Sequence, residues 1–495
     1  PIKRTKVIKI QQFTKYLSHI VQVSRNNGPS PPGSDSRRHG KICEPQTFIC
    51  HCWLLFLSLC YAKTLTQMKI TVRTIIFAVI CSTLAACAPN QGAHISSTKE
   101  GYQLTVDGNP VFIKGIGGTN RPDIAVANGA NACRTWGGSI DEIAATTALA
   151  AQHGLYVMQG IWLPKEAEKY SDEEFKQQMR TFCREAAERF KDDPNLLIWG
   201  IGNEVELSGN NNREVWRFIN ELSKIIKSVD KRHLTATVIS HNREALDSIA
   251  RYAPSLDLVG INSYGPINEV RPMVLASDYD GPYIITEWGP TGWWETHKTS
   301  WDAPIEQTGE EKRKIYEARY NEAVLDDPRC LGSFVFLWGQ KEERTPTWFS
   351  MFVEDNVEGL PLKGEKTPSV EAMQRVWTGK EPQQHAPVVT GIVIDGKMPV
   401  ESPETTSGTP FKVQISAQDR DGDTMQYVWE ILHEATVLGF GGSYEPRPER
   451  YGEVITTDTP QAEFTITEPG NYRVYVYVLD GTGYASTVNS PIRIL

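Results

Sequence analysis

The sequence feature that most limits the possible folds is an alternation of strand-like and helix-like segments between residues 110 and 378. Short apolar runs are typical of buried parallel strands, and amphipathic segments lie between most of them. Eight such units over about 280 residues predict a (β/α)8 TIM barrel. The eight expected strands span residues 110–117, 131–137, 154–162, 196–204, 234–240, 256–264, 283–289 and 332–339.

The expected helices are recognised by apolar residues that recur every three or four positions. In residues 171–191, Phe175, Met179 and Phe182 follow this spacing and form one apolar face. Ser171 followed by Glu174 predicts a capping box at the start of that helix. Only the first strand is followed by a poor helix. The other expected helices span residues 139–152, 213–231, 242–252, 309–326 and 368–378.

The pattern changes after residue 380, which divides the chain into domains. Residues 100–380 form the expected barrel, and residues 381–387 form a polar, proline-containing linker. Residues 388–495 contain short alternating runs separated by Gly, Pro and Asp, which predicts an all-β sandwich of the immunoglobulin type. Strings such as DRDGDTMQYVWEI resemble polycystic-kidney-disease-type modules. We expect this module to act as a spacer or packing domain, with carbohydrate binding as the alternative.

The charge is divided unevenly along the chain. Residues 1–86 hold 12 Lys and Arg but only two acids, although the whole chain has a net charge of −9. The remaining 39 basic and 58 acidic residues give residues 87–495 a net charge of −19. This balance argues against a nucleic-acid partner, which would require a basic stripe.

The basic N-terminal stretch contains a targeting pattern. Lys69 and Arg73 precede the apolar run TIIFAVICSTLAA, which is too short for a permanent membrane helix and is followed by Cys87. Residues 68–86 resemble a bacterial lipoprotein signal peptide, with residues 87–99 as a tether. The resemblance implies lipidation of Cys87 and a location in the bacterial cell envelope, at the outer membrane or on its periplasmic side. A plain secretory signal is the alternative, and we expect residues 1–67 to be a non-native or disordered segment.

Neither a metal nor a cofactor is expected. Cys50, His51 and Cys52 have metal-binding side chains but lack a second ligand pair. Asp419, with the acids that follow it in DRDGD, lacks the remaining ligands of a calcium-binding EF-hand loop. The sequence does not indicate the oligomeric state.

Polar residues end several of the expected strands. In TIM barrels the catalytic groups lie at the carboxyl ends of the strands. Glu204 ends the fourth strand and Glu287 the seventh, so two carboxylates are expected to face one another across the barrel mouth. Glycoside hydrolysis requires such a pair, because one carboxyl protonates the leaving oxygen and the other attacks the anomeric carbon in retaining enzymes. Glu206 is the competing carboxylate on the fourth strand.

Four motifs in order make the resemblance specific. The strings RTWG, IWGIGNEVE, GINSYG and ITEWGP are similar to motifs of the clan of retaining TIM-barrel glycoside hydrolases (clan A), and most similar to the barrel of glycoside hydrolase family 2. The resemblance covers residues 100–380. Family 2 enzymes carry β-sandwiches before the barrel, whereas here the sandwich follows it, so we expect a single-barrel relative.

The resemblance implies a role for each strand-end residue. Glu204 would be the acid/base and Glu287 the nucleophile. Asn203 would bind the sugar 2-hydroxyl, Arg134 and Tyr264 would hydrogen-bond the nucleophile, and Trp338 would form the floor beneath the sugar. The other side chains expected to contact substrate are Trp136, Asn262 and Trp288.

The sequence thus predicts a retaining β-glycoside hydrolase acting on a β-linked polysaccharide or oligosaccharide, with a β-glucan, β-1,3-linked among the options, as substrate. A transglycosylase or an exo-β-glycosidase of the galactosidase or mannosidase type would use the same site. The alternative from another class is a noncatalytic glycan-binding surface lipoprotein. The membrane is expected to be contacted only through the lipid anchor.

Overall fold

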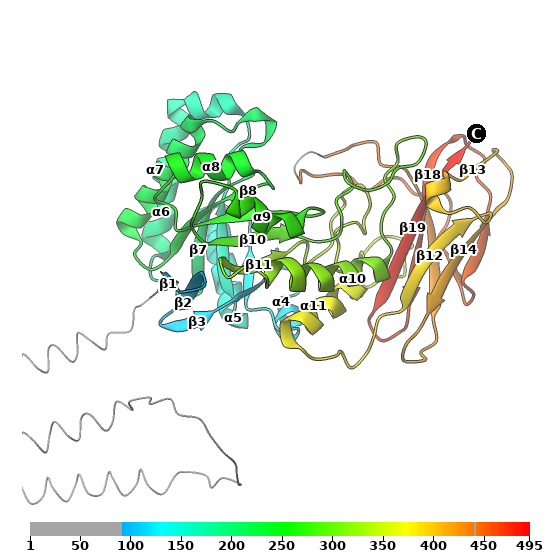
Figure 1. Cartoon of the computed structure of the whole chain (residues 1–495). Coiled ribbons are helices and arrows are strands. Elements are labelled where there is room, and N and C mark those ends of the chain that lie inside the picture. The colour runs from blue at the N-terminus through cyan, green and yellow to red at the C-terminus, as the bar shows by residue number, and fades with distance from the viewer. Residues whose placement is uncertain (1–91, 440–441) are drawn as a thin grey trace, which may run out of the picture. The chain divides into compact units, whose positions relative to one another are not determined.

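The computed structural model describes residues 92–439 and 442–495, and these contain a barrel followed by a β-rich C-terminal domain (Figure 1). Eight parallel strands close into a barrel in the order β10-β11-β4-β5-β6-β7-β8-β9. The predicted TIM barrel is therefore confirmed. Its strands are β4 (Ile113–Gly117), β5 (Ala132–Arg134), β6 (Tyr156–Ile161), β7 (Leu196–Asn203), β8 (Leu234–Ile239), β9 (Leu258–Asn262), β10 (Tyr283–Trp288) and β11 (Cys330–Val335).

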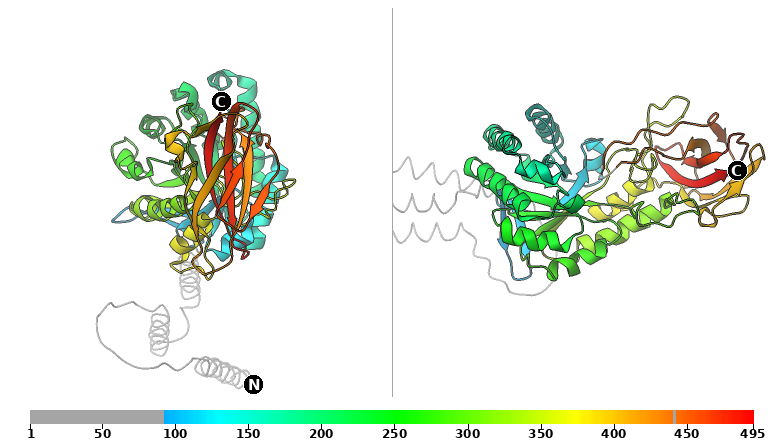
Figure 2. Two further views of the ribbon diagram at one scale, coloured as in Figure 1. Left: turned by 90° about the vertical axis from the view of Figure 1, so that its right-hand side faces the viewer. Right: turned by 90° about the horizontal axis from the view of Figure 1, so that it is seen from above.

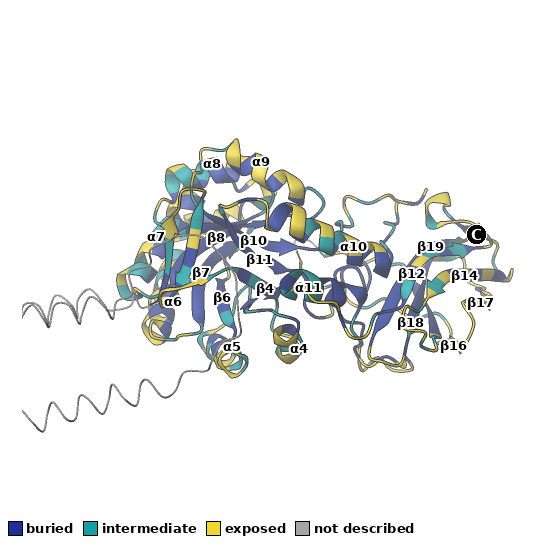
Figure 3. Ribbon diagram, turned by 60° about the horizontal axis from the view of Figure 1, so that its bottom comes forward, coloured by how far each residue is buried: buried dark blue, intermediate teal, exposed yellow. Residues whose placement is uncertain are grey.

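The helices surround the barrel with their polar faces outward, as the exposed outer surfaces in Figure 3 show. The helix after the first strand has only six residues, as expected from the sequence. The helices are α4 (Pro122–Ala127), α5 (Ile140–His153), α6 (Glu173–Phe190), α7 (Arg213–Val229), α8 (Arg243–Tyr252), α9 (Val270–Leu275), α10 (Gly309–Arg319) and α11 (Pro368–Thr378).

One predicted helix start is wrong by a residue. Asp172, not Ser171, is the N-cap of α6, and its carboxylate accepts hydrogen bonds from the backbone N–H groups of Glu174 and Phe175. Ser171 instead ends a preceding 3-10 turn. Aspartate is at least as good a cap as serine and its charge favours the positive end of the helix dipole.

A small antiparallel sheet of β1 (Ala93–Ser97), β2 (Tyr102–Val106) and β3 (Asn109–Val111) precedes the barrel. Its backbone bonds to Arg232 and Pro328, which lie just before β8 and β11, so it packs at the amino-terminal end of the barrel strands. Leu104 shares a hydrophobic cluster with Phe334 of β11. Part of the expected tether 87–99 is therefore a strand, because its side chains help to close the barrel bottom.

The C-terminal residues form two sheets, one of order β12-β14-β17 and one of order β13-β19-β18-β15-β16 (Figure 2). Side chains from both sheets, such as Val413 and Trp429, share one buried core. The sequence pattern missed the last long strand, whose residues include Ser and Asn. The strands are β12 (Val388–Ile394), β13 (Glu404–Thr405), β14 (Phe411–Gln418), β15 (Gln426–His433), β16 (Ile455–Thr457), β17 (Gln461–Phe464), β18 (Gly470–Leu479) and β19 (Ala485–Ile494).

Buried polar groups join the C-terminal domain to the barrel. Asn489 of β19 donates a hydrogen bond of 2.6 Å to Glu306, which lies in the loop before α10 and also accepts from Lys312. Arg473 of β18 donates to the backbone oxygen of Pro304. β19 can bury a polar side chain such as Asn489 because a charged group of the barrel, Glu306, is its hydrogen-bond partner.

Candidate active site

Four strand ends bring the expected site residues together at the carboxyl end of the barrel. Arg134 ends β5, Asn203 ends β7 and Asn262 ends β9, and Glu287 is the last residue but one of β10. All four are buried, with less than 10% of each residue exposed. The parallel direction of the strands places these ends at one rim.

Irregular pairing aims the two carboxylates. The register of β7 against β8 shifts between Gly200 and Asn203, and Glu204 follows with a left-handed φ of 51°. The register of β10 against β9 shifts between Ile285 and Glu287. A bulge turns a side chain away from the direction that regular alternation would give it, and bulges and left-handed residues cluster at functional sites.

Glu287 is held by three donors. Its Oε1 accepts hydrogen bonds from Arg134 Nη1 at 2.9 Å and from Trp136 Nε1 at 2.6 Å, and its Oε2 accepts one from the Tyr264 hydroxyl at 3.1 Å. The pKa of Tyr264 is raised well above 10 by burial and by the charge of Glu287, so the phenol keeps its proton and donates it. These three donors, one of which is the buried guanidinium of Arg134, fix the orientation of the carboxylate.

A hydrogen-bond network links Glu287 to Glu204. Arg134 Nη2 donates to Asn203 Oδ1 at 2.7 Å, and Asn262 Nδ2 lies 3.3 Å from the same oxygen. Asn262 Nδ2 also donates to Glu204 Oε1 at 3.0 Å. The structure therefore brings together both predicted carboxylates and five of the seven residues expected to bind substrate or nucleophile, namely Arg134, Trp136, Asn203, Asn262 and Tyr264.

The environment of Glu204 favours its protonated form. Burial, followed by the negative charge of Glu287, raises the pKa of Glu204 from 4.5 to about 7. Lys165, whose Nζ lies 3.4 Å from Glu204 Oε2, opposes this rise. A carboxyl with this pKa can carry a proton at neutral pH and release it to a leaving group.

Glu206, the competing carboxylate of the fourth strand, makes no hydrogen bond to the described residues of this network and binds Ser240 instead. Its Oε1 accepts hydrogen bonds from the backbone and hydroxyl of Ser240 at 2.7 and 2.8 Å. It therefore fixes the end of β8, while Glu204 reaches Asn262.

Two of the expected substrate-binding tryptophans are misplaced by the sequence reasoning. Trp338 is fully buried and packs on Phe352 and Trp377, and Trp288 is fully buried against Tyr316 and Tyr320. Both belong to the hydrophobic core between the barrel strands and the surrounding helices. Neither ring can offer a face to a sugar, so both predictions are corrected.

Phe336, two residues before Trp338, packs on two of the side chains that bind Glu287. Its ring lies 5.7 Å from Trp136 and 6.1 Å from Tyr264, both in edge-to-face geometry. Sequence reasoning missed Phe336 because it belongs to the continuous apolar run SFVFLW, where nothing distinguishes a cleft residue from a core residue. It also missed Lys165, since a lysine in a loop carries no spacing signal.

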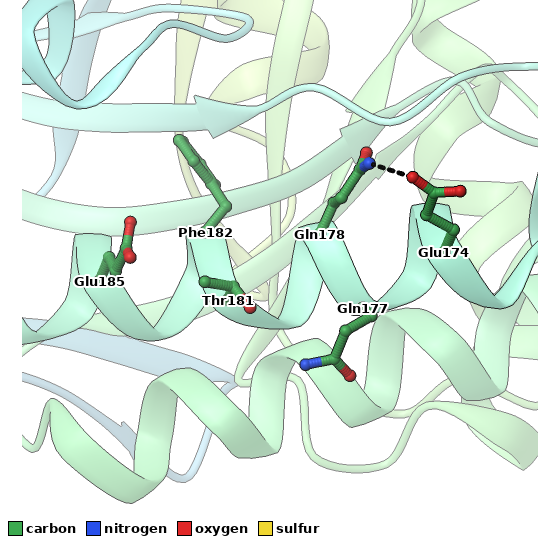
Figure 4. A pocket seen from close by; sticks show the side chains of 6 residues that line it. All are labelled: Glu174, Gln177, Gln178, Thr181, Phe182 and Glu185. Carbon is green, nitrogen blue, oxygen red and sulfur yellow. Dashed lines mark hydrogen bonds between the residues drawn. The ribbon is translucent and has the colours of Figure 1, made fainter.

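A shallow depression lies on α6 and is lined only by residues of that helix, among them Glu174, Gln178 and Phe182 (Figure 4). Gln178 donates a hydrogen bond to Glu174 across it. It contains no strand-end residue and is not part of the carboxylate site.

Within residues 92–439 and 442–495, no group of three or more His, Cys, Asp or Glu side chains could hold a metal ion. No helix in this part of the chain is long and apolar enough to cross a membrane. Cys87 and the Cys50-His51-Cys52 string lie outside the described residues.

Residues 124–254 match the model of the family described as cellulase (glycosyl hydrolase family 5). The match runs from α4 to α8 and includes Asn203 and Glu204. Family 5 lies in the expected clan A, although the sequence motifs resemble family 2. The matched family and the carboxylate pair both support the conclusion that the protein is a glycoside hydrolase.

One curated relative is the probable mannan endo-1,4-β-mannosidase A-2 of Aspergillus terreus (strain NIH 2624 / FGSC A1156), 29% identical over 68 residues, which cover 14% of this chain and 17% of the relative. Among solved structures, a family GH2 β-galacturonidase from Eisenbergiella tayi bound to galacturonate has a TM-score of 0.44 at 18% identity, covering 58% of this chain and 54% of that one. A Ruminococcus gnavus β-glucuronidase in complex with uronic deoxynojirimycin has a TM-score of 0.46 at 14% identity, with coverages of 58% and 52%. The chain thus spans about half of these solved chains and less of the curated relative.

Proposed function

We propose that the protein is a retaining hydrolase of β-linked polysaccharides or oligosaccharides, with Glu204 as acid/base and Glu287 as nucleophile. The observation that carries the proposal is the contrast between the two carboxyls. Glu287 accepts three hydrogen bonds, one of them from Arg134, whereas the pKa of Glu204 is raised to about 7. Two carboxyls with such different environments supply the acid and the nucleophile of a double displacement.

In the first step, Glu287 attacks the anomeric carbon while Glu204 gives its proton to the leaving glycosidic oxygen. The bond between the carbon and that oxygen breaks, and a glycosyl ester on Glu287 forms. In the second step, Glu204 takes a proton from water, the water oxygen attacks the same carbon, and Glu287 leaves as a carboxylate. Two inversions give net retention.

Asn203 is placed to bind the sugar in this scheme. Its Oδ1 accepts from both Arg134 and Asn262, which fixes the amide, and among the described residues its Nδ2 has no protein partner. We assign this donor to the 2-hydroxyl of the sugar that is attacked, because hydrogen bonds to this hydroxyl strengthen in the transition state of glycosidases. Trp136 and Phe336 supply apolar surface beside it.

For the substrate we propose a β-glucan, β-1,3-linked chains included, or a β-mannan. The names of the matched cellulase family and of the weakly similar β-mannosidase support β-1,4 linkages. Transglycosylation and exo-cleavage remain alternatives at the same site. We also propose that Cys87 is lipidated and holds the enzyme in a bacterial cell envelope.

The test is incubation with laminarin, cellulose oligosaccharides, mannan and aryl β-glycosides, with products sized by chromatography and the anomer released first identified by NMR. Release of the β-anomer from a cleaved substrate supports the proposal, and release of the inverted anomer refutes the retaining mechanism.

Glu287→Gln should abolish turnover while keeping oligosaccharide binding. Glu188→Gln, on an exposed face of α6, is the matched control and should keep full activity. Wild-type binding without cleavage of any of these substrates would favour the noncatalytic alternative.

A further inference from the structure

A segment of the C-terminal domain lies against the barrel loop that follows β11. This segment comprises residues 442–447, between β15 and β16, and is called the 442–447 segment below. Lys341 of the barrel loop donates a hydrogen bond of 3.0 Å to the backbone oxygen of Gly442. Glu445 accepts from the backbone N–H of Arg344 at 2.8 Å and from its guanidinium at 3.4 Å. Both Arg344 and Glu445 are buried, so the contact is a fixed one.

The end of the segment is anchored to both domains. Arg447 donates to Glu354 of the barrel loop at 2.8 and 3.1 Å, and to Glu430 of β15 at 2.7 Å. An arginine shared by two buried carboxylates has a defined geometry, since its donors are coplanar. The segment is therefore held at both ends against the barrel.

One chain of contacts leads from Glu445 to the nucleophile. The guanidinium of Arg344 lies 3.7 Å from the ring centre of Trp293. The ring of Trp293 packs at 5.2 Å on Trp294, and Trp294 packs at 5.5 Å on Tyr264, both edge to face. Tyr264 donates to Glu287. The aromatic rings beside the nucleophile are thus supported from the C-terminal domain.

A second chain of contacts leads through Lys341. Its ammonium pairs with Glu343 at 2.7 Å and lies 5.9 Å from the ring centre of Phe336. Glu343 in turn accepts from Trp293 Nε1 at 3.3 Å. Since Phe336 packs on Trp136, the backbone of the 442–447 segment lies within a few side chains of the carboxylate pair by this route as well.

Two large rings in or next to these chains of contacts are exposed: Trp294 packs on Tyr264, and Tyr444 precedes Glu445 in the sequence. Trp294 is 47% exposed and Tyr444, within the segment, is 84% exposed. The flat C–H face of a sugar is a partner that an exposed aromatic ring fits.

We infer that the 442–447 segment forms one wall of the sugar-binding cleft, so that the C-terminal domain completes the active site. Tyr444 contacts a sugar unit beyond the scissile bond. Glu445 is a positioning residue that holds Arg344 and, through it, Trp293. The inference rests on the proposed glycosidase function and adds to it a specificity for longer chains.

The test uses the full chain and two oligosaccharides of the polymer that it cleaves: the shortest one that is hydrolysed and a hexasaccharide. Tyr444→Ala should lower kcat/KM for the hexasaccharide about tenfold, mainly through KM, and leave the shortest substrate within about twofold. Tyr444→Phe keeps the ring and should restore wild-type values. Leu275→Ala removes an exposed apolar side chain at the C-terminal end of α9 and should change the kinetics on neither substrate.

Glu445→Gln should raise KM for the hexasaccharide more than for the shortest substrate, while kcat stays close to wild type. An equal fall in kcat for both substrates, or a change in unfolding temperature alone, would overturn the positioning role. If Tyr444→Ala and the wild type have equal kinetics on the hexasaccharide, the inference that the 442–447 segment contacts the sugar chain is wrong. If the wild type cleaves no oligosaccharide at all, the proposed function itself has failed.

Discussion

The raised pKa of Glu204 predicts that this residue destabilises the folded protein above neutral pH. Burial and the charge of Glu287 raise its pKa from 4.5 to about 7. That rise corresponds to about 3 kcal/mol of free energy between the protonated and charged forms. Between pH 4.5 and 7 the folded state therefore binds more protons than the unfolded state, so the free energy of unfolding falls as the pH rises through this window.

Glu204→Gln removes this titration while preserving the shape and the bond to Asn262. Relative to wild type, the variant should gain about 3 kcal/mol of unfolding free energy between pH 4 and pH 8. The difference between the two proteins cancels the titration of the groups that do not interact with Glu204. The measurement is urea unfolding followed by tryptophan fluorescence at several pH values, extrapolated linearly to water.

Glu188→Gln is the control for this series. Glu188 is exposed on α6 and makes no ion pair within residues 92–439 and 442–495, so its substitution should give a difference independent of pH. A pH-independent difference for Glu204→Gln as well would refute the reasoning, as would a variant that loses stability toward pH 8. Under the proposed mechanism, this gain would mean that the acid of the reaction is obtained at the expense of stability.

Three further outcomes test the site. The value of kcat/KM should fall as the pH rises above about 7, because Glu204 then loses the proton that it donates; a flat profile to pH 9 would contradict its role as acid. Tyr264→Phe removes one hydrogen bond to Glu287 and should lower kcat about 10-fold to 100-fold in steady-state assays, whereas an unchanged kcat would argue against its role. Trp338→Phe should leave KM unchanged and lower the free energy of unfolding in urea by about 1–2 kcal/mol, because the ring is buried in the core. A raised KM would instead indicate that Trp338 contacts substrate.

The barrel could be predicted from the sequence because its strands are buried on both faces. A run such as LLIWGIGN in β7 has no polar position to obscure it, and the helices that cover the sheet have a regular apolar face. β19 escaped prediction for the opposite reason. Its residues ASTVNSPIRI lack an apolar alternation, and Asn489 is buried only because Glu306 of the barrel reaches it.

The carboxylate pair could be predicted because strand-end chemistry follows from topology. The order of the motifs fixed which strands carry Glu204 and Glu287, and the barrel places those strand ends on one rim. The aromatic residues could not be assigned in this way. A tryptophan near a strand end faces either the barrel mouth or the helices, and a bulge exchanges the two directions. In β10 the register shift before Trp288 turns its ring towards the helices, although Glu287 beside it faces the barrel mouth.

The polar contacts between β19 and the barrel have a consequence for how the molecule unfolds. Separating the two domains would leave Glu306 without its donor Asn489, and would expose Arg473, which is now fully buried. Uncovering groups whose partners lie in the other domain is costly, so neither domain gains from opening first. We therefore expect the barrel and the C-terminal domain to melt together in a single calorimetric transition, and a barrel cut after residue 387 to be less stable than the full chain.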